Sequence, residues 1–356
     1  MITVTEYSGK NVGVFGLGKA GDATVDALLA GGAAVYAWDD SEAGREKLAA
    51  RLGKKITLSE PKDWPWQDIA ALVLSPGVPL THPAPHESVL LAKQHGKPVV
   101  GDIELLCKAC PDARYIAITG TNGKSTTTTL IGHILKTCGV TCEVGGNLGT
   151  AALSLAPLGK DAVYVLETSS YQLDLIHQAR FNVALWLNIT PDHIDRHGNI
   201  DGYILAKLRI FANQHAGDTA VVAVDDEYSH ATLEALMRAK KQRTVGVSAK
   251  SMLPDGIYVE EGMLHDDEQG FTFDLKPIAT LTGRHNWQNA AAAYAACRAI
   301  GLKPLDICAA MKSFAGLRHR LQLAATIRGV RFINDSKATN ADATSNALAP
   351  YDTIYW

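Results

Sequence analysis

RYIAITGTNGKSTTTTLIGHILKTCG, residues 114–139, combines a short apolar strand, a tight polar loop and a helix. The run from Tyr115 to Ile118 is apolar, and apolar side chains recur at helical spacing after the loop, at Leu130, Ile131, Ile134 and Leu135. A loop of this kind directs backbone N–H groups and the positive end of a helix at an anion. We therefore expect this loop to bind phosphate.

The loop residues are of the types that a nucleotide phosphate site needs. Lys124 would reach the β- and γ-phosphates, and the Ser125 hydroxyl would take one position on a bound Mg²⁺. The spacing departs from G-x-x-x-x-G-K-[ST], because Gly120 lies only three residues before Gly123. The alternative is a glycine-rich turn that only starts a helix, but such a turn has no need of Gly-Lys-Ser-Thr after a buried strand.

Composition bounds the class of protein. A chain of 356 residues suggests two or three domains, and its net charge of −3 gives no electrostatic reason to expect nucleic acid or an anionic membrane as a partner. The first residues lack a signal-peptide pattern and no apolar run reaches membrane-spanning length, so we expect a cytoplasmic protein. Six cysteines include a C-x-x-C at Cys107 and Cys110, with Cys138 and Cys142 downstream; we favour buried thiols over a zinc site.

The N-terminal part contains a nucleotide-binding fingerprint. A strand at 11–15 leads into Gly16-x-Gly18-x-x-Gly21 and a helix, and a second strand ends in Asp39 and Asp40. This pattern binds a dinucleotide or another diphosphate whose ribose reaches the acid. No second half of a dinucleotide fold precedes the phosphate loop, which favours a nucleotide sugar. A further strand at 70–74 ends in the turn 75–79, a ligand loop or a plain Pro/Gly turn.

Beyond the phosphate loop, several apolar runs end in polar residues. The strand at 162–166 ends at Glu167, a suitable Mg²⁺ ligand or a glutamate that merely ends a strand. The strand at 183–189 precedes His193, which could hold a metal or a phosphate oxygen or be an ordinary surface histidine. A helix over 203–211 carries Lys207, which spacing alone places in solvent.

The last third of the chain is less regular. A strand at 220–224 ends in Asp225-Asp226, and residues 244–280 suggest a small β appendage. The polar run 283–289 precedes an alanine-rich helix at 290–299, and it could face a nucleotide or cap that helix. Residues 317–356 begin a further strand-loop-helix unit with its strand at 330–333, and 351–356 look like the start of a strand.

Seven motifs in one order carry a family resemblance: GTNGKST, LETSSYQL, NITPDHIDRH, AKLRI, GRHNWQN, GLRHR and INDSKATN. They resemble the Mur ligases of peptidoglycan synthesis over nearly the whole chain. DSKATN and the early fingerprint are similar to the branch that adds D-glutamate to UDP-N-acetylmuramoyl-L-alanine. The resemblance implies an α/β protein with a Rossmann-like UDP-sugar domain (1–102), a central P-loop ATPase-type domain (103–316) and the start of a C-terminal α/β domain (317–356).

The resemblance also implies ATP-driven amide formation with two Mg²⁺ sites. The substrate carboxylate would attack the γ-phosphate, and the amine of D-glutamate would displace phosphate from the acyl phosphate. By the same resemblance, Lys207 would be carbamylated, which turns an ammonium into a carboxylate and reverses the interpretation from spacing. The catalytic residues would be Lys124, Glu167, His193 and Lys207, and the metal ligands Ser125, Glu167, His193 and Lys207.

The remaining site residues are also implied by the resemblance. ATP would bind at Gly120, Thr121, Asn122, Gly123, Lys124, Ser125, Thr126, Asn289, Arg320 and Asp335. The UDP-sugar would bind at Gly18, Lys19, Ala20, Asp39, Asp40, Ser75, Gly77 and Asn147. Lys337 and Thr339 would lie beside the incoming D-glutamate.

Two further expectations concern length and class. Family members continue beyond residue 356, so we expect the chain as given to keep its nucleotide sites and turn over poorly. The alternatives are another ligase of the Mur and folylpolyglutamate synthetase superfamily, a non-catalytic nucleotide-sugar binding module, or an NAD-dependent dehydrogenase. The early fingerprint argues against the first, the four catalytic residues against the second, and the phosphate loop against the third.

Overall fold

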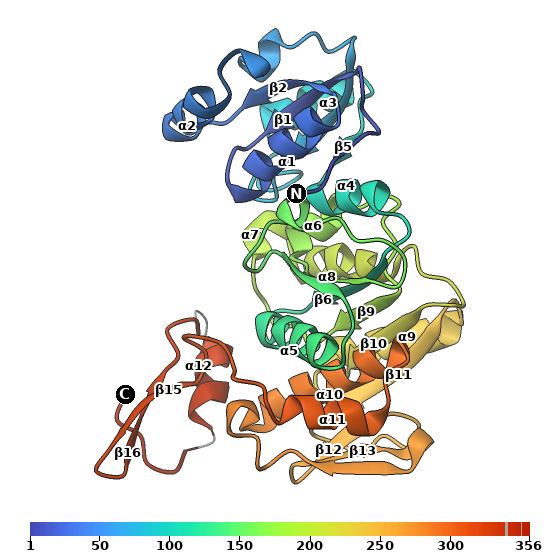
Figure 1. The fold of residues 1–356 in the computed structure, drawn as a ribbon, viewed down its shortest axis with the longest axis vertical. Helices are drawn as coiled ribbons and strands as arrows, with labels where there is room; N and C mark the ends of the chain where they lie inside the picture. The colour runs from blue at the N-terminus through green and yellow to red at the C-terminus, as the bar shows by residue number, and fades with distance from the viewer. Residues whose placement is uncertain (339–340, 350) are drawn as a thin grey trace. The chain divides into compact units, whose positions relative to one another are not determined.

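The computed structural model describes residues 1–338, 341–349 and 351–356, without the side chains of residues 342, 343 and 346. It is an α/β structure with parallel sheets, as expected (Figure 1). The chain forms two compact units: unit 1 is Met1–Tyr115, Glu143–Phe181 and Pro191–Asn213, and unit 2 is Ile116–Cys142, Asn182–Thr190 and Gln214–Trp356. Domain boundaries near 102 and 316 stay predictions.

Unit 1 begins with a five-stranded parallel sheet in the order β3-β2-β1-β4-β5. Its elements are β1 (Asn11–Phe15), α1 (Lys19–Ala30), β2 (Ala34–Trp38), α2 (Glu42–Leu52), β3 (Thr57–Leu58), β4 (Ile69–Leu74), α3 (Glu87–Gln94), β5 (Val99–Val100) and α4 (Asp102–Ala109). The strand order reverses between β1 and β4. Ligands of open α/β sheets bind at such a switch point, outside the carboxyl ends of the strands.

The loop after β1 needs glycine for two reasons. Gly16 has φ +88°, in the region that favours glycine. A Cβ on Gly21 would lie 1.8 Å from the Gly16 carbonyl oxygen, so only glycine lets α1 approach the loop this closely. The expected strand-loop-helix is confirmed.

The rest of unit 1 carries the segments around Glu167 and Lys207. Its elements are β7 (Cys142–Gly146), which starts at the last residue of a unit 2 segment, β8 (Val163–Glu167), α6 (Ser170–Asp174), α7 (Ile194–His197) and α8 (Ile200–Leu208). All five residues of β8 are buried, and α6 and α8 pack together. The segment 209–211, which we expected to continue α8, is a 3₁₀ helix.

Unit 2 holds the phosphate-loop strand and most of the second sheet, in the order β14-β13-β12-β11-β10-β9-β6. Its elements are β6 (Arg114–Thr119), which starts in unit 1, α5 (Lys124–Thr137), β9 (Val183–Trp186), β10 (Thr219–Ala223), α9 (Glu227–Ala239), β11 (Arg243–Ser248), β12 (Ile257–Glu260), β13 (Met263–Asp266), β14 (Phe271–Asp274), α10 (Arg284–Ala299), α11 (Pro304–Met311), β15 (Gln322–Ile327), β16 (Val330–Asn334) and α12 (Ala341–Leu348). The β strands within 244–280 do not form a separate appendage, because β11 pairs in parallel with β10 and β12 to β14 extend the same sheet.

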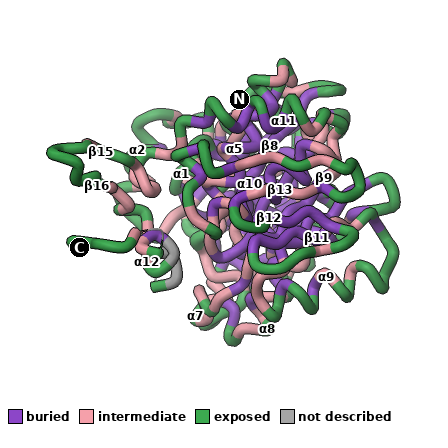
Figure 2. Tube along the Cα trace, turned by 90° about the horizontal axis from the view of Figure 1, so that it is seen from below, coloured by how far each residue is buried: buried purple, intermediate pink, exposed green. Residues whose placement is uncertain are grey.

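The core of unit 2 lies between this sheet and its helices. Helix α10 packs on β9 to β12 beside α5 and α11, and α9 packs on β10 and β11. All of β10 is buried, and since successive side chains point to opposite faces, both faces of the sheet are covered there. Figure 2 shows buried residues concentrated in β9, β11, β12, β13 and α10, whereas the β15–β16 hairpin is largely exposed.

Two expectations about the end of the chain need correction. Helix α10 starts at Arg284 and not at residue 290, so most of the polar run 283–289 is helical and three of its side chains, Asn286, Gln288 and Asn289, are buried. The strand expected at 330–333 is confirmed as part of β16, but β15 was not predicted, and residues 351–356 form no strand.

Candidate active site

The phosphate loop ends β6 and starts α5. Gly123 is the N-cap residue with φ +83°, and no side chain caps the helix. The first N–H groups of a helix have no partner within the helix, so the start of α5 offers donors to an anion. In this structure the Lys124 ammonium donates to the carbonyl oxygens of Gly120 (2.8 Å) and Thr121 (2.7 Å), within its own loop. To reach a phosphate, Lys124 would exchange these carbonyls for phosphate oxygens.

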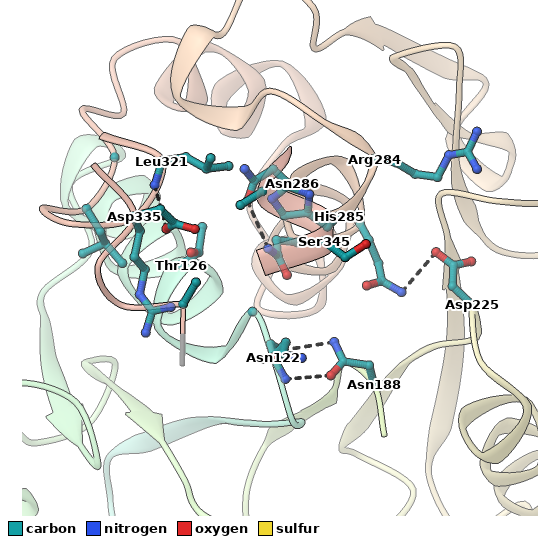
Figure 3. Close-up of a pocket in the computed structure, with 18 of the residues that line it drawn as sticks. Asn122, Thr126, Asn188, Asp225, Arg284, His285, Asn286, Leu321, Asp335 and Ser345 are labelled. Atoms are coloured by element: carbon teal, nitrogen blue, oxygen red, sulfur yellow. Dashed lines mark hydrogen bonds between the residues drawn. The ribbon is translucent and has the colours of Figure 1, made fainter. Parts of the chain in front are cut away.

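Asn188 holds the first half of this loop. The Thr121 N–H donates to the Asn188 carbonyl oxygen (3.0 Å), and the Asn122 N–H donates to the Asn188 side-chain oxygen (2.8 Å). The Asn188 side-chain nitrogen donates back to the Asn122 carbonyl oxygen (3.1 Å; Figure 3). The amides of Thr121 and Asn122 are therefore engaged, which leaves the α5 end of the loop as the place for phosphate. We did not predict Asn188; its only signal is its position after β9.

A pocket of about 340 Å³ opens beside this loop in unit 2 (Figure 3). Six of the predicted ATP-binding residues line it: Asn122, Gly123, Thr126, Asn289, Arg320 and Asp335. The Arg320 guanidinium also donates to the Ser125 hydroxyl (3.0 Å), and Asp335 accepts the Leu321 N–H (3.0 Å). Residues separated by more than 200 positions in the sequence thus meet around one cavity of the size that small-molecule sites have.

Asn289 lies directly behind the phosphate loop. It is buried, its side-chain oxygen accepts the Thr127 hydroxyl (3.3 Å), and its side-chain nitrogen donates to Asn286 (3.2 Å). A Cβ on Gly123 would lie 2.3 Å from that Asn289 oxygen. Gly123 is therefore required both by its positive φ and by its contact with α10.

Other polar residues of the pocket were not predicted as ligands. The Gln288 side-chain nitrogen donates to Asp225 (3.1 Å), which follows β10. Burial lowers the pKa of His285, and the nearby Asp335 carboxylate partly opposes this shift. Asp225 could have been found as an acid that ends a buried strand. Most of the polar run before the alanines lines the pocket, and that it faces a nucleotide stays a prediction.

Glu167, in unit 1, has the features of a metal ligand. One of its carboxylate oxygens accepts the Asn147 side-chain nitrogen (2.8 Å). The other oxygen is buried and has no hydrogen-bond partner among the described residues. A buried carboxylate oxygen without a donor suits a hard cation such as Mg²⁺. Asn147, predicted at the UDP-sugar, here orients Glu167.

Lys207 is buried at 1% exposure, so placement in solvent is wrong. Its ammonium lies 4.7 Å from the centre of the Tyr203 ring. His197 is close by, bonded to the Ser170 hydroxyl (2.9 Å) and 3.6 Å from Asp174. Burial, followed by the charge of Lys207, lowers the pKa of His197 to about 4. Lys207 therefore lies in the interior of unit 1, beside Tyr203 and close to His197.

His193 and the cysteines complete the metal candidates. His193 is the N-cap residue of α7 with φ +54°, its side chain is half exposed, and its Nε2 lies 3.7 Å from Asp192. In the part of the chain that the structure describes, no three His, Cys, Asp or Glu residues form a metal-binding group, and the six cysteines are free. Lys124 and Ser125 belong to unit 2 and Glu167, His193 and Lys207 to unit 1, so their assembly around one triphosphate stays a prediction.

Apart from Asn147, the predicted UDP-sugar residues of unit 1 lie just after the carboxyl ends of three neighbouring strands, β2, β1 and β4. The Ser75 hydroxyl donates to the Gly16 carbonyl oxygen (2.7 Å) and so joins the two loops. Asp39 accepts the N–H groups of Leu17 and Ser41 (2.7 Å for Ser41), and Asp40 lies 3.4 Å from His86. Gly18, Lys19 and Ala20 cap and start α1.

The D-glutamate side is described only in part. The Lys337 side chain is exposed, and its backbone N–H donates to the His319 carbonyl oxygen (3.2 Å). Thr339 lies outside the described residues.

Comparison with known proteins places the chain in a family. Residues 118–297 match the Mur ligase middle domain. The whole chain aligns with UDP-N-acetylmuramoylalanine–D-glutamate ligases of Paramagnetospirillum magneticum (51% identity, 77% of that protein) and Rhodospirillum rubrum (50%, 76%). Among the described residues, no helix has the length and apolarity to cross a membrane.

Solved structures share the fold. The UDP-N-acetylmuramate-alanine ligase from Thermotoga maritima has a TM-score of 0.58 at 20% identity, covering 96% of this chain and 77% of its own. The UDP-N-acetylmuramate:L-alanyl-gamma-D-glutamyl-meso-diaminopimelate ligase from Neisseria meningitides has 0.58 at 17%, covering 87% and 99%. With half of its length matching the middle domain and all of it aligned to the two relatives above, the chain belongs to the Mur ligase family, in the branch of those relatives.

Proposed function

We propose that this chain is an ATP-dependent ligase that joins D-glutamate to UDP-N-acetylmuramoyl-L-alanine and forms ADP and phosphate, a step of peptidoglycan precursor synthesis. The observation that carries the proposal is the pocket of unit 2, where six residues expected at ATP lie together beside the phosphate loop. The identity of about half over the full chain to D-glutamate ligases supports the same substrates. ATP and UDP-linked sugars are cytoplasmic compounds, so we place the reaction there.

ATP would bind with its base and ribose in the pocket and its phosphates at the start of α5. The first N–H groups of α5 and the Lys124 ammonium would hold the phosphate oxygens. Arg320 donates a hydrogen bond to the Ser125 hydroxyl, which shows that it reaches the loop. When a nucleotide binds, Arg320 would release that hydroxyl. Positioning and charge neutralisation are what phosphoryl transfer requires of a protein.

Glu167, Ser125, His193 and Lys207 would hold Mg²⁺, with Lys207 as the carbamate. The unpartnered buried oxygen of Glu167 supports this assignment. Bound Mg²⁺ would neutralise charge on the phosphates and the attacking carboxylate. Asn147 would keep the Glu167 carboxylate oriented, because it occupies one oxygen and leaves the other to a ligand.

The reaction would proceed in two steps. The alanyl carboxylate oxygen forms a bond to the γ-phosphorus while the bond to the β-phosphate oxygen breaks, which gives ADP and an acyl phosphate. The amine of D-glutamate then attacks the acyl carbon, and phosphate leaves from the tetrahedral intermediate. Lys337 and Thr339 would lie beside the D-glutamate.

The direct test is phosphate release from ATP by the full-length natural protein, with each candidate UDP-muramoyl substrate paired with each candidate amino acid. We expect release only when UDP-N-acetylmuramoyl-L-alanine and D-glutamate are both present. Equal release with L-alanine or diaminopimelate in place of D-glutamate would assign the chain to a different ligation, and release with no amino acid would make it an ATPase.

A further inference from the structure

Arg196, in α7 of unit 1, is held from two sides by groups of the same unit. One of its terminal nitrogens donates to the Gly77 carbonyl oxygen (2.9 Å). Its guanidinium carbon lies over the Tyr171 ring, 4.6 Å from the ring centre. The flat guanidinium is therefore fixed in place by a backbone carbonyl and an aromatic face.

The bonding of Arg196 is nevertheless incomplete. Its Nε is buried and has no hydrogen-bond partner in the described part of the chain. Within the same part, Arg196 forms no ion pair with a carboxylate. A buried donor without a partner is destabilising, so the unpartnered Nε–H of the Arg196 guanidinium is a feature that a bound acceptor would relieve. The group that matches a guanidinium fork is an oxyanion.

The neighbours of Arg196 indicate which ligand would carry this oxyanion. Gly77 belongs to the loop after β4, and Ser75 of that loop is bonded to the Gly16 carbonyl at the switch point of the sheet. The α7 segment touches the same loop region a second time, because a Cβ on Gly198 would lie 2.9 Å from the His82 ring. Arg196 thus bridges the predicted UDP-sugar loop and the segment that carries His193.

We propose that Arg196 binds an oxyanion of the UDP-linked substrate and holds the 75–77 loop closed on it. The inference rests on the proposed function for the identity of that substrate. Two of its groups have the required chemistry: the diphosphate and the alanyl carboxylate. In the competing explanation, Arg196 only ties the loop through Gly77 and contacts no ligand.

Calorimetric titration of Arg196→Gln and of the unchanged protein with four ligands tests the inference. The ligands are uridine, UDP, UDP-N-acetylmuramoyl-L-alanine and the matching alaninamide. We expect Arg196→Gln to bind about tenfold or more weakly than the unchanged protein, starting with the ligand that first carries the oxyanion that Arg196 contacts. A loss of this size is what removal of a charge-assisted hydrogen bond causes. A loss that first appears from uridine to UDP identifies the diphosphate, and one that appears only with the free carboxylate identifies the alanyl group.

Two results would overturn the inference: affinities equal to those of the unchanged protein for all four ligands, or the same factor of loss for uridine as for the others. The second would show that Arg196 only shapes the loop. Arg51→Gln is the matched control, because Arg51 pairs with Asp22 and Asp26 on the surface of the same unit. It should leave all four affinities unchanged.

Folding and function are separated by two further measurements. If Arg196→Gln melts early, Arg196→Lys is titrated instead, and a loss of about threefold or more confined to the oxyanion step supports the inference, because an ammonium cannot reproduce the fork. The unchanged protein is assayed for ligation in parallel. An absence of ligation with an Arg196-dependent UDP affinity defeats the proposed function alone, whereas ligation with no Arg196 dependence of binding defeats the inference alone.

Discussion

Gly123 shows how one residue links the phosphate loop to the pocket. Its positive φ lets the chain turn from β6 into α5, and its missing side chain makes room for Asn289. Lys124, next in sequence, folds back on the loop carbonyls. The proposed nucleotide site would therefore depend on a position that carries no functional group.

We predict that Gly123→Ala abolishes binding of ATP analogues and lowers the free energy of unfolding by roughly 2–4 kcal/mol, the sum of a strained φ and a clash. Gly139→Ala is the matched control, because Gly139 also has positive φ (+76°) but has open space around its Cα. It should cost about 1 kcal/mol and leave nucleotide binding unchanged. Denaturant unfolding and calorimetry measure both, and a Gly123→Ala protein that binds ATP normally would refute this role.

Lys207 provides a second test at this scale. Lys207 is 1% exposed, its ammonium lies 4.7 Å from the centre of the Tyr203 ring, and a lysine is seldom buried this completely. If it is carbamylated, Lys207→Ala in the full-length protein should lose activity by about 100-fold or more, and short carboxylic acids should restore part of it. Exposed Lys136→Ala is the control and should keep full activity. No rescue, together with no carbamate signal from ¹³C-bicarbonate by NMR, would count against the hypothesis.

At the scale of elements, the functional groups lie where strands end. Loops after β1 and β4 meet through Ser75 and Gly16 in unit 1, and loops after β6 and β9 meet through Asn122 and Asn188 in unit 2. Parallel strands bring such loops to one edge of a sheet. Each site is thus built by loops that are distant in the sequence and adjacent in the fold.

We expect Ser75→Ala to weaken UDP binding by about tenfold and to cost about 1 kcal/mol of stability, because it frees the Gly16 loop. Thr24→Ala removes a comparable bond, from a buried hydroxyl to the Ala20 carbonyl oxygen (2.8 Å), without joining the two loops. It should cost similar stability and leave the UDP affinity unchanged. Equal effects of both variants on the UDP affinity would argue against the Ser75 bridge as a binding element.

Helix α4 carries a buried acid whose titration is testable. Burial raises the pKa of Asp102 above its ordinary 3.8, and the Gln172 amide and the Ile103 N–H oppose this only in part. A raised folded pKa gives stability that is present below 3.8 and is lost as pH rises through the folded value. The side chain of Asp102→Asn does not titrate, so the variant does not lose this stability. Its free energy of unfolding should therefore rise relative to that of the unchanged protein as pH rises from about 4 to 8. Parallel curves would contradict the shift.

The sequence predicted most strands and both glycine loops, because short apolar runs and required glycines are local signals. It failed where packing decides. We expected α10 to start at residue 290, where the alanines begin, but it starts at Arg284. The polar residues before the alanines show no apolar pattern of their own, and three of them are buried only because the chain packs around them. Asn188 and the open oxygen of Glu167 become recognisable only when their partners are placed in space.

At the scale of the whole molecule, the residues proposed to bind the two nucleotide substrates lie in different units. The predicted UDP-sugar residues lie in unit 1 and the proposed ATP pocket in unit 2, while Glu167, His193 and Lys207 belong to unit 1. Ligation requires the alanyl carboxylate of one ligand to meet the γ-phosphate of the other. The central claim of the proposed function is that this alanyl carboxylate is phosphorylated before the amine of D-glutamate attacks it.

Oxygen transfer tests this claim most directly. The full-length protein is given ATP, D-glutamate and UDP-N-acetylmuramoyl-L-alanine labelled with ¹⁸O in both alanyl carboxylate oxygens, and the released phosphate is analysed by mass. The acyl phosphate route predicts one ¹⁸O in each phosphate, with the other kept in the new amide. Amide product accompanied by unlabelled phosphate would contradict it.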